Sequence, residues 1–400
     1  MRSALFSISE IETDSYRKIE IIALESESSV QDMPTETLHL ASDERVLLIS
    51  ADDKYGTVVT NTSIYTVMLS NDRIFTNFIP LNAKETPIGI YQCETYFALH
   101  MSDATVFIYT LGSDTPTRLP TGAPPAALLA ASKDALILCV PSPTGTRVRL
   151  FSPTTGKDVL INGAPFKGIV PLNGVCRMSV SPDGKLVSLL DRTDQLFVLS
   201  TEDPGDVRLL ADGVTAHSWL SELPALVYIA KGELRFCVCP QAALVDGDLV
   251  KSATMQLACP FAVSKTTTIE YATPTEALIV TPPGNGTAPA MAQVPTPFFA
   301  QPLHRALGRS TRGNLGPALT ACYSLIRHMS ADSAANSSSE VPQDALWAAI
   351  ATHAMFQGDR SAAMRAYGEL GWYSRVKFIQ SLQGMEHGEL NAALREFRAY

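Results

Sequence analysis

Hydrophobic positions along residues 1–300 come in short runs rather than in long helical stripes. The runs are rich in Val, Ile, Leu, Thr and Tyr, and clusters of Asp, Asn, Gly, Pro and Ser separate them. Short runs of this composition between turn residues are typical of antiparallel strands. No long segment here has an apolar period of 3.6 residues, so a parallel sheet with interleaved helices is disfavoured. The clearest predicted strands are 45–50, 56–60, 63–69, 73–78, 95–101 and 104–110.

A unit of three predicted strands recurs along this region. In residues 179–200 the unit has a Pro-Asp-Gly turn and an Asp-Arg-Thr-Asp turn between its strands, and residues 128–159 and 218–240 follow the same plan. The units begin about 40 residues apart, a period associated with four-stranded propeller blades. We therefore predict a β-propeller of about seven four-stranded blades over residues 1–300. A pair of β-sandwiches is the alternative, and it would not need a fixed period.

The pattern changes to helical spacing after the Pro- and Gly-rich stretch 281–299. A short sequence with a leading Gly and a late Ala-Leu or Ala-Met pair recurs at 313–319, 358–364 and 388–394. The last two copies are 30 residues apart, which suits the helical hairpins of a solenoid. We predict a short α-solenoid of TPR-like hairpins over 301–400, with a flexible Ser-rich insert at 330–341.

Local chemistry predicts where the helices of this tail begin and end. Gly358 can end a first helix in the left-handed conformation, and Asp359 can cap the amide groups of the next. Small alanine side chains in the second helix would let the two helices approach closely. The predicted core positions of the tail are Leu346, Ile350, Ala354, Ala362, Ala363, Ala366, Tyr367 and Leu370.

The end of the predicted solenoid has no obvious polar capping repeat. An uncapped solenoid end implies either a partner or a naturally longer chain. We therefore predict that aromatic side chains of the tail are buried partly inside the solenoid and partly against a partner, and that self-association through the tail is possible. The candidate interaction surface is Trp347, Tyr367, Trp372, Tyr373 and Phe378.

Composition and charge narrow the class of protein. The chain has 400 residues, 46% hydrophobic and 18% charged, which is enough for two domains. With a net charge of −9, the chain lacks the excess of basic residues that is typical of a nucleic-acid binder. The sequence shows neither a signal peptide nor 18 uninterrupted apolar residues, so we predict no membrane insertion. Seven cysteines, mostly within apolar runs, suit a reducing compartment, so we expect a soluble intracellular protein.

The sequence carries none of the common catalytic or cofactor motifs. It lacks a phosphate-binding loop, a G-x-G-x-x-G after a strand and a G-x-S-x-G elbow, and its histidines are far apart. Cys237 and Cys239 come nearest to a metal motif, but they are spaced by one residue without a second pair, which favours two packed thiols. We predict no enzymatic activity, no cofactor and no metal site.

An ordered series of segments resembles one known family. Residues 191–200, 217–240 and 245–250 resemble the closing blades of the second propeller in the eighty-kilodalton subunit family of intraflagellar transport complex B. The family continues with a short helical link, a helix opening Leu/Met-Trp-Ala and an Ala-rich helix ending Ala-Tyr. The matching segments here are 315–329, 345–357 and 362–382.

This resemblance implies a non-enzymatic scaffold subunit of intraflagellar transport complex B. Such a subunit would support anterograde transport and assembly of the cilium or flagellum through contacts with other complex B subunits. It would be found in the cilium or flagellum and at the basal body, with a cytoplasmic pool. The family has two propellers and this chain has residues for one, so the family's contact between the first propeller and a calponin-homology partner is not carried over.

A coatomer-like vesicle-coat subunit is the alternative within the same architecture, because it has the same order of propeller and solenoid. Recognition of cargo motifs by such propellers usually needs a basic patch. Residues 1–300 carry 32 Asp and Glu against 21 Lys and Arg, which argues against this alternative.

Overall fold

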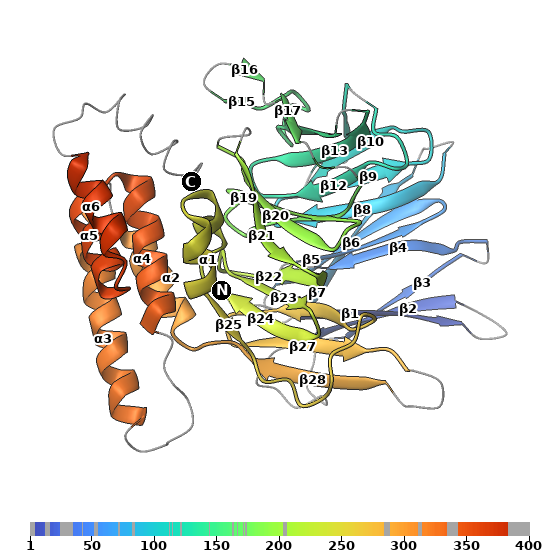
Figure 1. The fold of residues 1–400 in the computed structure, drawn as a ribbon. Helices are drawn as coiled ribbons and strands as arrows, with labels where there is room; N and C mark the ends of the chain where they lie inside the picture. Colours follow the sequence, from blue (N-terminus) through green and yellow to red (C-terminus); the bar gives the residue numbers. More distant parts are fainter. Residues whose placement is uncertain are drawn as a thin grey trace. The chain divides into compact units, whose positions relative to one another are not determined.

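The computed structural model describes much of the chain between residues 5 and 382. The gaps are 13–16, 25–34, 42, 52–54, 71–72, 82–84, 112, 114, 121, 144, 162–163, 166, 171, 173, 203–205, 284–288, 311–313 and 334–342. The chain divides into two compact units, an N-terminal unit (Met1–Pro171) and a C-terminal unit (Leu172–Tyr400). Figure 1 shows strands in the first and both strands and helices in the second.

The N-terminal unit consists of antiparallel sheets whose strands mostly follow one another in sequence. Its three-stranded sheet is β1 (Leu5–Glu12), β2 (Arg17–Leu24) and β3 (Thr35–His39). Its four-stranded sheets are β4 (Val46–Ala51), β5 (Tyr55–Thr60), β6 (Ser63–Ser70) and β7 (Arg73–Pro80); β8 (Pro87–Cys93), β9 (Tyr96–Met101), β10 (Val106–Thr110) and β11 (Thr117–Arg118); and β12 (Leu128–Ala131), β13 (Leu136–Ser142), β14 (Gly145–Phe151) and β17 (Lys167–Val170). A hairpin of β15 (Leu160–Ile161) and β16 (Ala164–Pro165) lies between β14 and β17 in the chain.

The C-terminal unit continues the same plan with three further sheets. They are β18 (Val175–Val180), β19 (Leu186–Asp191), β20 (Gln195–Ser200) and β21 (Val207–Asp212); β22 (Val214–Trp219), β23 (Leu226–Ala230), β24 (Glu233–Cys237) and β25 (Thr254–Gln256); and β26 (Thr268–Ala272), β27 (Glu276–Thr281) and β28 (Ala290–Pro295). Between β24 and β25 the chain makes a 3₁₀ helix (Pro240–Leu244) and the helix α1 (Gly247–Ser252).

The sheets match the predicted blade plan. Apart from the small hairpin, the described residues form seven sheets, of which five have four strands and two have three. Each strand predicted from the sequence is present, and the recurring unit corresponds to three successive strands of one sheet. Central strands such as β19 and β23 are buried along their whole length. This burial explains their nearly continuous apolar sequence.

Five helices follow the sheets in the C-terminal unit. They are α2 (Ala300–Arg309), α3 (Gly316–Ser333), α4 (Gln343–Gln357), α5 (Arg360–Glu369) and α6 (Tyr373–Ser381). The predicted turn between α4 and α5 is confirmed: Gly358 has φ +73°, and the Asp359 side chain accepts a hydrogen bond from the amide of Ala362 at 3.0 Å. A second left-handed glycine, Gly371 with φ +75°, separates α5 from α6.

The helix α4 is buried well beyond its predicted core positions Leu346, Ile350 and Ala354. Its residues from Ala345 to Thr352 are all buried, and so are Ala354 and Met355. The reason is that the 3₁₀ helix, α1, α2, α3 and α5 all contact α4. A helix that is apolar on every side belongs in the centre of a core.

Two predictions about the tail concern its limits. The strands end at Pro295 and α2 begins at Ala300, but one compact unit contains both the last three sheets and the helices. The division into a propeller over 1–300 and a solenoid over 301–400 therefore stays a prediction. Of the predicted flexible insert at 330–341, residues up to Ser333 belong to α3 and the others lie outside the described residues, as does the third sequence copy at 388–394. No helix in the described part of the chain is long and apolar enough to span a membrane.

Candidate interaction surface

The insertion between β24 and β25 prepares the place where the helices dock. Pro240 suits the first turn of its 3₁₀ helix because it lacks the amide hydrogen that would have no partner there. Asp246 then caps α1, and its side chain accepts a hydrogen bond from the amide of Asp248 at 3.1 Å. The apolar side chains that follow, Leu249 and Val250, are buried. The insertion therefore presents an apolar side to the rest of the unit.

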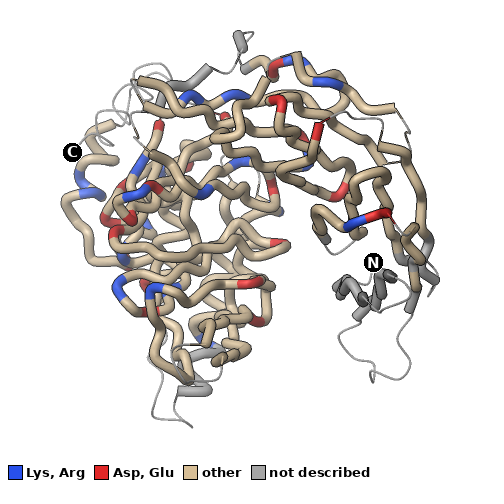
Figure 2. Tube along the Cα trace, turned by 90° about the vertical axis from the view of Figure 1, so that its right-hand side faces the viewer, with Lys and Arg blue, Asp and Glu red and all other residues tan. Residues whose placement is uncertain are grey.

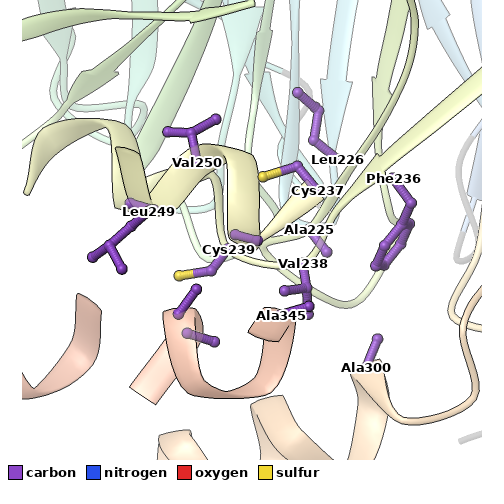
Figure 3. Packing of buried hydrophobic residues seen from close by; sticks show 14 of the residues in the cluster. Ala225, Leu226, Phe236, Cys237, Val238, Cys239, Leu249, Val250, Ala300 and Ala345 are labelled. Atoms are coloured by element: carbon purple, nitrogen blue, oxygen red, sulfur yellow. The ribbon is translucent and has the colours of Figure 1, made fainter. Parts of the chain in front are cut away.

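The helices α2 and α4 pack against this insertion through small and apolar side chains. Figure 3 shows Cys239 and Leu249 of the insertion facing the helix that carries Ala345, with Ala300 of α2 below Val238. All of these side chains belong to one buried cluster, which continues from the sheets into α6. Alanines along α4 allow the close approach of its neighbours. The sheets and helices of the C-terminal unit therefore share one core.

A buried histidine adds a directional contact to this apolar packing. The Nε2–H of His304, on α2, donates a hydrogen bond to the carbonyl oxygen of Val238 at 2.7 Å. Burial lowers the pKa of His304, which keeps its ring neutral. A neutral ring suits a single hydrogen bond to a carbonyl, so this contact fixes α2 on the segment that follows β24.

An ion pair joins α6 to the same insertion. The Nε of Arg375 lies 3.0 Å from Oδ2 of Asp246, and the Asp246 side chain is only 4% exposed. The hydroxyl of Tyr367, on α5, donates a long hydrogen bond of 3.5 Å to the same carboxylate oxygen. Burial first, and then the neighbouring Asp246 charge, raise the pKa of Tyr367, so this hydroxyl stays protonated. One buried carboxylate thus holds α1, α5 and α6 together.

The structure places two of the five predicted surface residues in the core. Trp347 is 3% exposed, and its ring meets that of Tyr323 on α3 edge to face at 5.2 Å. Tyr367 is fully buried. These two side chains therefore stabilise the helices and are not available to a partner.

The other three residues lie at the start of α6 or along it. Trp372 and Phe378 are half-buried, and the Trp372 ring lies 5.9 Å from that of Tyr367. Tyr373 is 70% exposed. The structure thus brings Trp372 and Tyr373 together at the Gly371 turn, and we define the candidate surface as Trp372, Tyr373 and Phe378. Its role in binding stays a prediction.

Sequence reasoning missed the residues that link distant segments. The sequence Asp246-Gly247-Asp248 before two apolar residues carried a signal for the start of a helix, although the surrounding sequence is strand-rich. The sequence around Arg375 gave no sign that this residue pairs with Asp246, because the two lie 129 positions apart. The same is true of Arg365, on α5, whose Nε donates to the hydroxyl of Tyr323 on α3 at 2.7 Å.

The two cysteines nearest to a metal motif lie in the core of the C-terminal unit. Cys237 and Cys239 are both free and buried. Burial raises the pKa of the Cys237 thiol to about 11 and that of the Cys239 thiol to about 12. Protonated thiols are poor metal ligands, because the thiolate is the form that binds metal ions.

Charged residues are mixed along the described chain. Figure 2 shows Lys and Arg interspersed with Asp and Glu, without a long run of either sign.

Comparison with known proteins identifies the strand-rich part of the chain. A family model for the IFT80 second beta-propeller matches residues 14–281. A search of curated proteins gave no match. Among solved structures, the Dos1 propeller is 10% identical, with 66% of this chain and 72% of that chain covered and a TM-score of 0.43.

Two further solved structures have similarly low sequence identities and TM-scores. Hsv2p from Kluyveromyces lactis is 9% identical over 73% of this chain and 97% of its own, with a TM-score of 0.41. Apo AztD from Citrobacter koseri is 11% identical over 70% of this chain and 90% of its own, with a TM-score of 0.42. Because these similarities are low, the family match identifies the fold.

Proposed function

This chain belongs to the family of the IFT80 second β-propeller, and on that basis we propose that it is a non-enzymatic scaffold subunit of intraflagellar transport complex B. Its family associates it with intraflagellar transport and with the cilium. The observation that carries the proposal is the family match over residues 14–281. The finer parts of the proposal are a role in anterograde transport and in assembly of the cilium or flagellum.

The construction of the C-terminal unit supports a scaffold role. A subunit that connects neighbours must transmit force between its parts without bending. Here the last blades and the helices share one apolar core, and the His304 hydrogen bond and the Asp246–Arg375 ion pair add two directional contacts. A joint with this much buried contact suits a rigid connector rather than a hinge.

The partners that we propose are other complex B subunits. The candidate surface of Trp372, Tyr373 and Phe378 would contribute aromatic area to one such contact, because exposed aromatic side chains are enriched at protein interfaces. Self-association through the helical tail is a further possibility for the same surface. We propose localisation to the cilium or flagellum and the basal body, with a cytoplasmic pool.

Affinity purification of the tagged chain from flagellated cells, followed by mass spectrometry, tests this function. We expect complex B subunits to be recovered with the chain. The Asp246→Asn variant keeps the cap of α1 but weakens the ion pair, and we expect it to recover less of the complex. Recovery of vesicle-coat proteins in place of complex B subunits would overturn the proposal.

A further inference from the structure

A cavity of about 210 Å³ lies in the C-terminal unit beside α1. Three cations from three separate segments line it: Lys231 in the turn between β23 and β24, Arg235 in β24 and Lys251 in α1. Such a group is unusual in a chain whose net charge is −9. The cavity lies outside the joint between the insertion and the helices described above.

The lining of this cavity is rich in hydrogen-bond donors. Tyr228 lines it together with the three cationic residues, whereas the hydroxyl oxygen of Thr254, another lining residue, is buried. The one acid in the lining, Asp212, already accepts a hydrogen bond from the side-chain amide of Gln195 at 2.9 Å. A pocket with many donors and one engaged acceptor suits an anion.

Two of the cations also have acidic partners that do not line the cavity. Glu233 accepts from Arg235 at 2.7 Å through one nitrogen and 3.2 Å through another, and Asp248 lies 3.2 Å from the Lys251 ammonium. The Arg235 guanidinium has five N–H groups, so it keeps donors for a ligand. These ion pairs are exposed to solvent, so they reduce the charge of the two side chains only in part.

Lys231 is held at the cavity in a conformation that lysine rarely adopts. It has φ +54° and the following Gly232 has φ +78°, as in a two-residue type I′ turn, where Asn or Gly is usual. Its amide donates to the carbonyl oxygen of Gly213 at 2.9 Å. A Cβ at Gly213 would lie 3.0 Å from the Lys231 Cγ, so the lysine stem packs on this glycine.

The position of Lys231 therefore has a conformational cost. Among the described residues, no carboxylate lies within ion-pair distance of its ammonium group. Strained residues of this kind are concentrated at functional sites. The strained turn and the packed stem together hold the Lys231 side chain at the cavity.

We propose that this cavity binds a phosphate-type oxyanion through Lys231, Arg235 and Lys251. Donors that reach the cavity from two strands, a turn and a helix suit the oxygens of a tetrahedral anion better than those of a planar carboxylate. The anion is either free phosphate or a phosphorylated residue of a partner polypeptide, since both present the same oxygens. This inference is independent of the proposed function.

Isothermal titration calorimetry of the full chain with inorganic phosphate, at constant ionic strength, tests the site. We expect saturable binding that the Lys231→Asn variant weakens by at least about tenfold. Asparagine suits a positive φ, so the variant keeps the turn, which its circular dichroism spectrum and melting temperature would verify. The matched control is Lys185→Asn, in an exposed turn of the same unit, where the lysine lies 3.8 Å from Glu202. We expect this control to bind phosphate like the wild type.

A phosphoserine peptide and its unphosphorylated form distinguish the two sources of the anion. Tighter binding of the phosphopeptide than of inorganic phosphate would assign the site to a phosphorylated partner, and equal affinity would assign it to free phosphate. Three results would overturn the proposal: no saturable binding of either probe, equal binding by wild type and Lys231→Asn, or binding of acetate as tight as that of phosphate.

Discussion

The carboxylate of Asp246 and the guanidinium of Arg375 meet at 3.0 Å, although 129 positions separate them in the chain. One lies at the start of a helix inserted into a blade, and the other lies in the last described helix. Their ion pair joins α6 to the start of α1 within the C-terminal unit.

Replacement of Arg375 by Met should destabilise the protein strongly. The change leaves the buried Asp246 carboxylate without its cation, and breaking one side of a buried ion pair costs about 3 kcal/mol or more. Urea unfolding followed by tryptophan fluorescence would measure the loss. Lys377→Met, an exposed site on the same helix, is the control and should change the free energy of unfolding by less than about 0.5 kcal/mol. If both variants lost the same stability, the ion pair would not be the cause.

Acid should destabilise the protein through the buried His217 and the half-buried His353. Burial lowers the pKa of His217 to about 3 and that of His353 to about 4, whereas in the unfolded chain both have the ordinary value near 6.5. Below pH 6.5 the unfolded state therefore binds protons that the folded state does not, so stability is lost as the pH falls from about 6.5 towards 4. Between pH 6.5 and 5 the loss is at most about 2 kcal/mol per histidine.

Unfolding measurements at pH 7 and pH 5 would test this for His353. Its Nδ1 has no hydrogen-bond partner among the described residues, so His353→Leu removes the titrating group without breaking a bond at that atom. We expect the variant to lose less stability than the wild type between the two pH values. An unchanged pH dependence would show that His353 is not responsible.

Two glycines of the helical tail should respond in opposite ways to alanine. Gly358 has φ +73°, so alanine there should cost about 1 kcal/mol through backbone strain alone, since nothing lies within 4 Å of the added Cβ. Gly368 lies within α5 and also has open space around its Cβ, so alanine there should stabilise the protein by about 0.5–1 kcal/mol. Melting temperatures of the two variants should move in opposite directions. A gain for Gly358→Ala would contradict the left-handed turn.

Alanine at Trp347 and at Tyr373 should separate the core from the candidate surface. Trp347→Ala should cost about 3–5 kcal/mol because its ring is buried. Tyr373→Ala should leave stability within about 0.5 kcal/mol of the wild type, because the side chain is 70% exposed. If the candidate surface binds a partner, only Tyr373→Ala should reduce recovery of complex B while the protein stays folded. Normal recovery with this variant would remove Tyr373 from the interface.

Truncation before α2 should unfold part of the last blades. The family match ends at residue 281, but the buried side chains of the insertion, such as Cys239 and Leu249, pack in the same core as α4. A chain that ends at residue 299 would expose this apolar surface to water. We expect it to be recovered mainly in the insoluble fraction, in contrast to the full chain. A soluble fragment that unfolds cooperatively would show that the helices are not needed.

The sequence predicted those features that depend on local patterns. Strand lengths, turn residues and the cap of α5 follow from neighbouring residues, so the blades and the Gly358–Asp359 turn were foreseen. The insertion with α1 was missed because six residues are too few to show a helical period. The sequence also could not predict that Trp347 and Tyr367 are buried in the core, because an aromatic residue on a helix has the same sequence signal in a core and at an interface. Contacts between residues more than a hundred positions apart give no local signal in the sequence.

The position of α4 also has a consequence during synthesis. The apolar insertion at residues 240–252 leaves the ribosome well before residues 343–357, which cover it. At translation rates of about 5–20 residues per second, on the order of 5–20 s would pass between the synthesis of the insertion and that of α4. During that interval the nascent chain exposes an apolar surface that α4 later buries. Chaperone demand should therefore peak between the synthesis of residues 240–252 and that of residues 343–357.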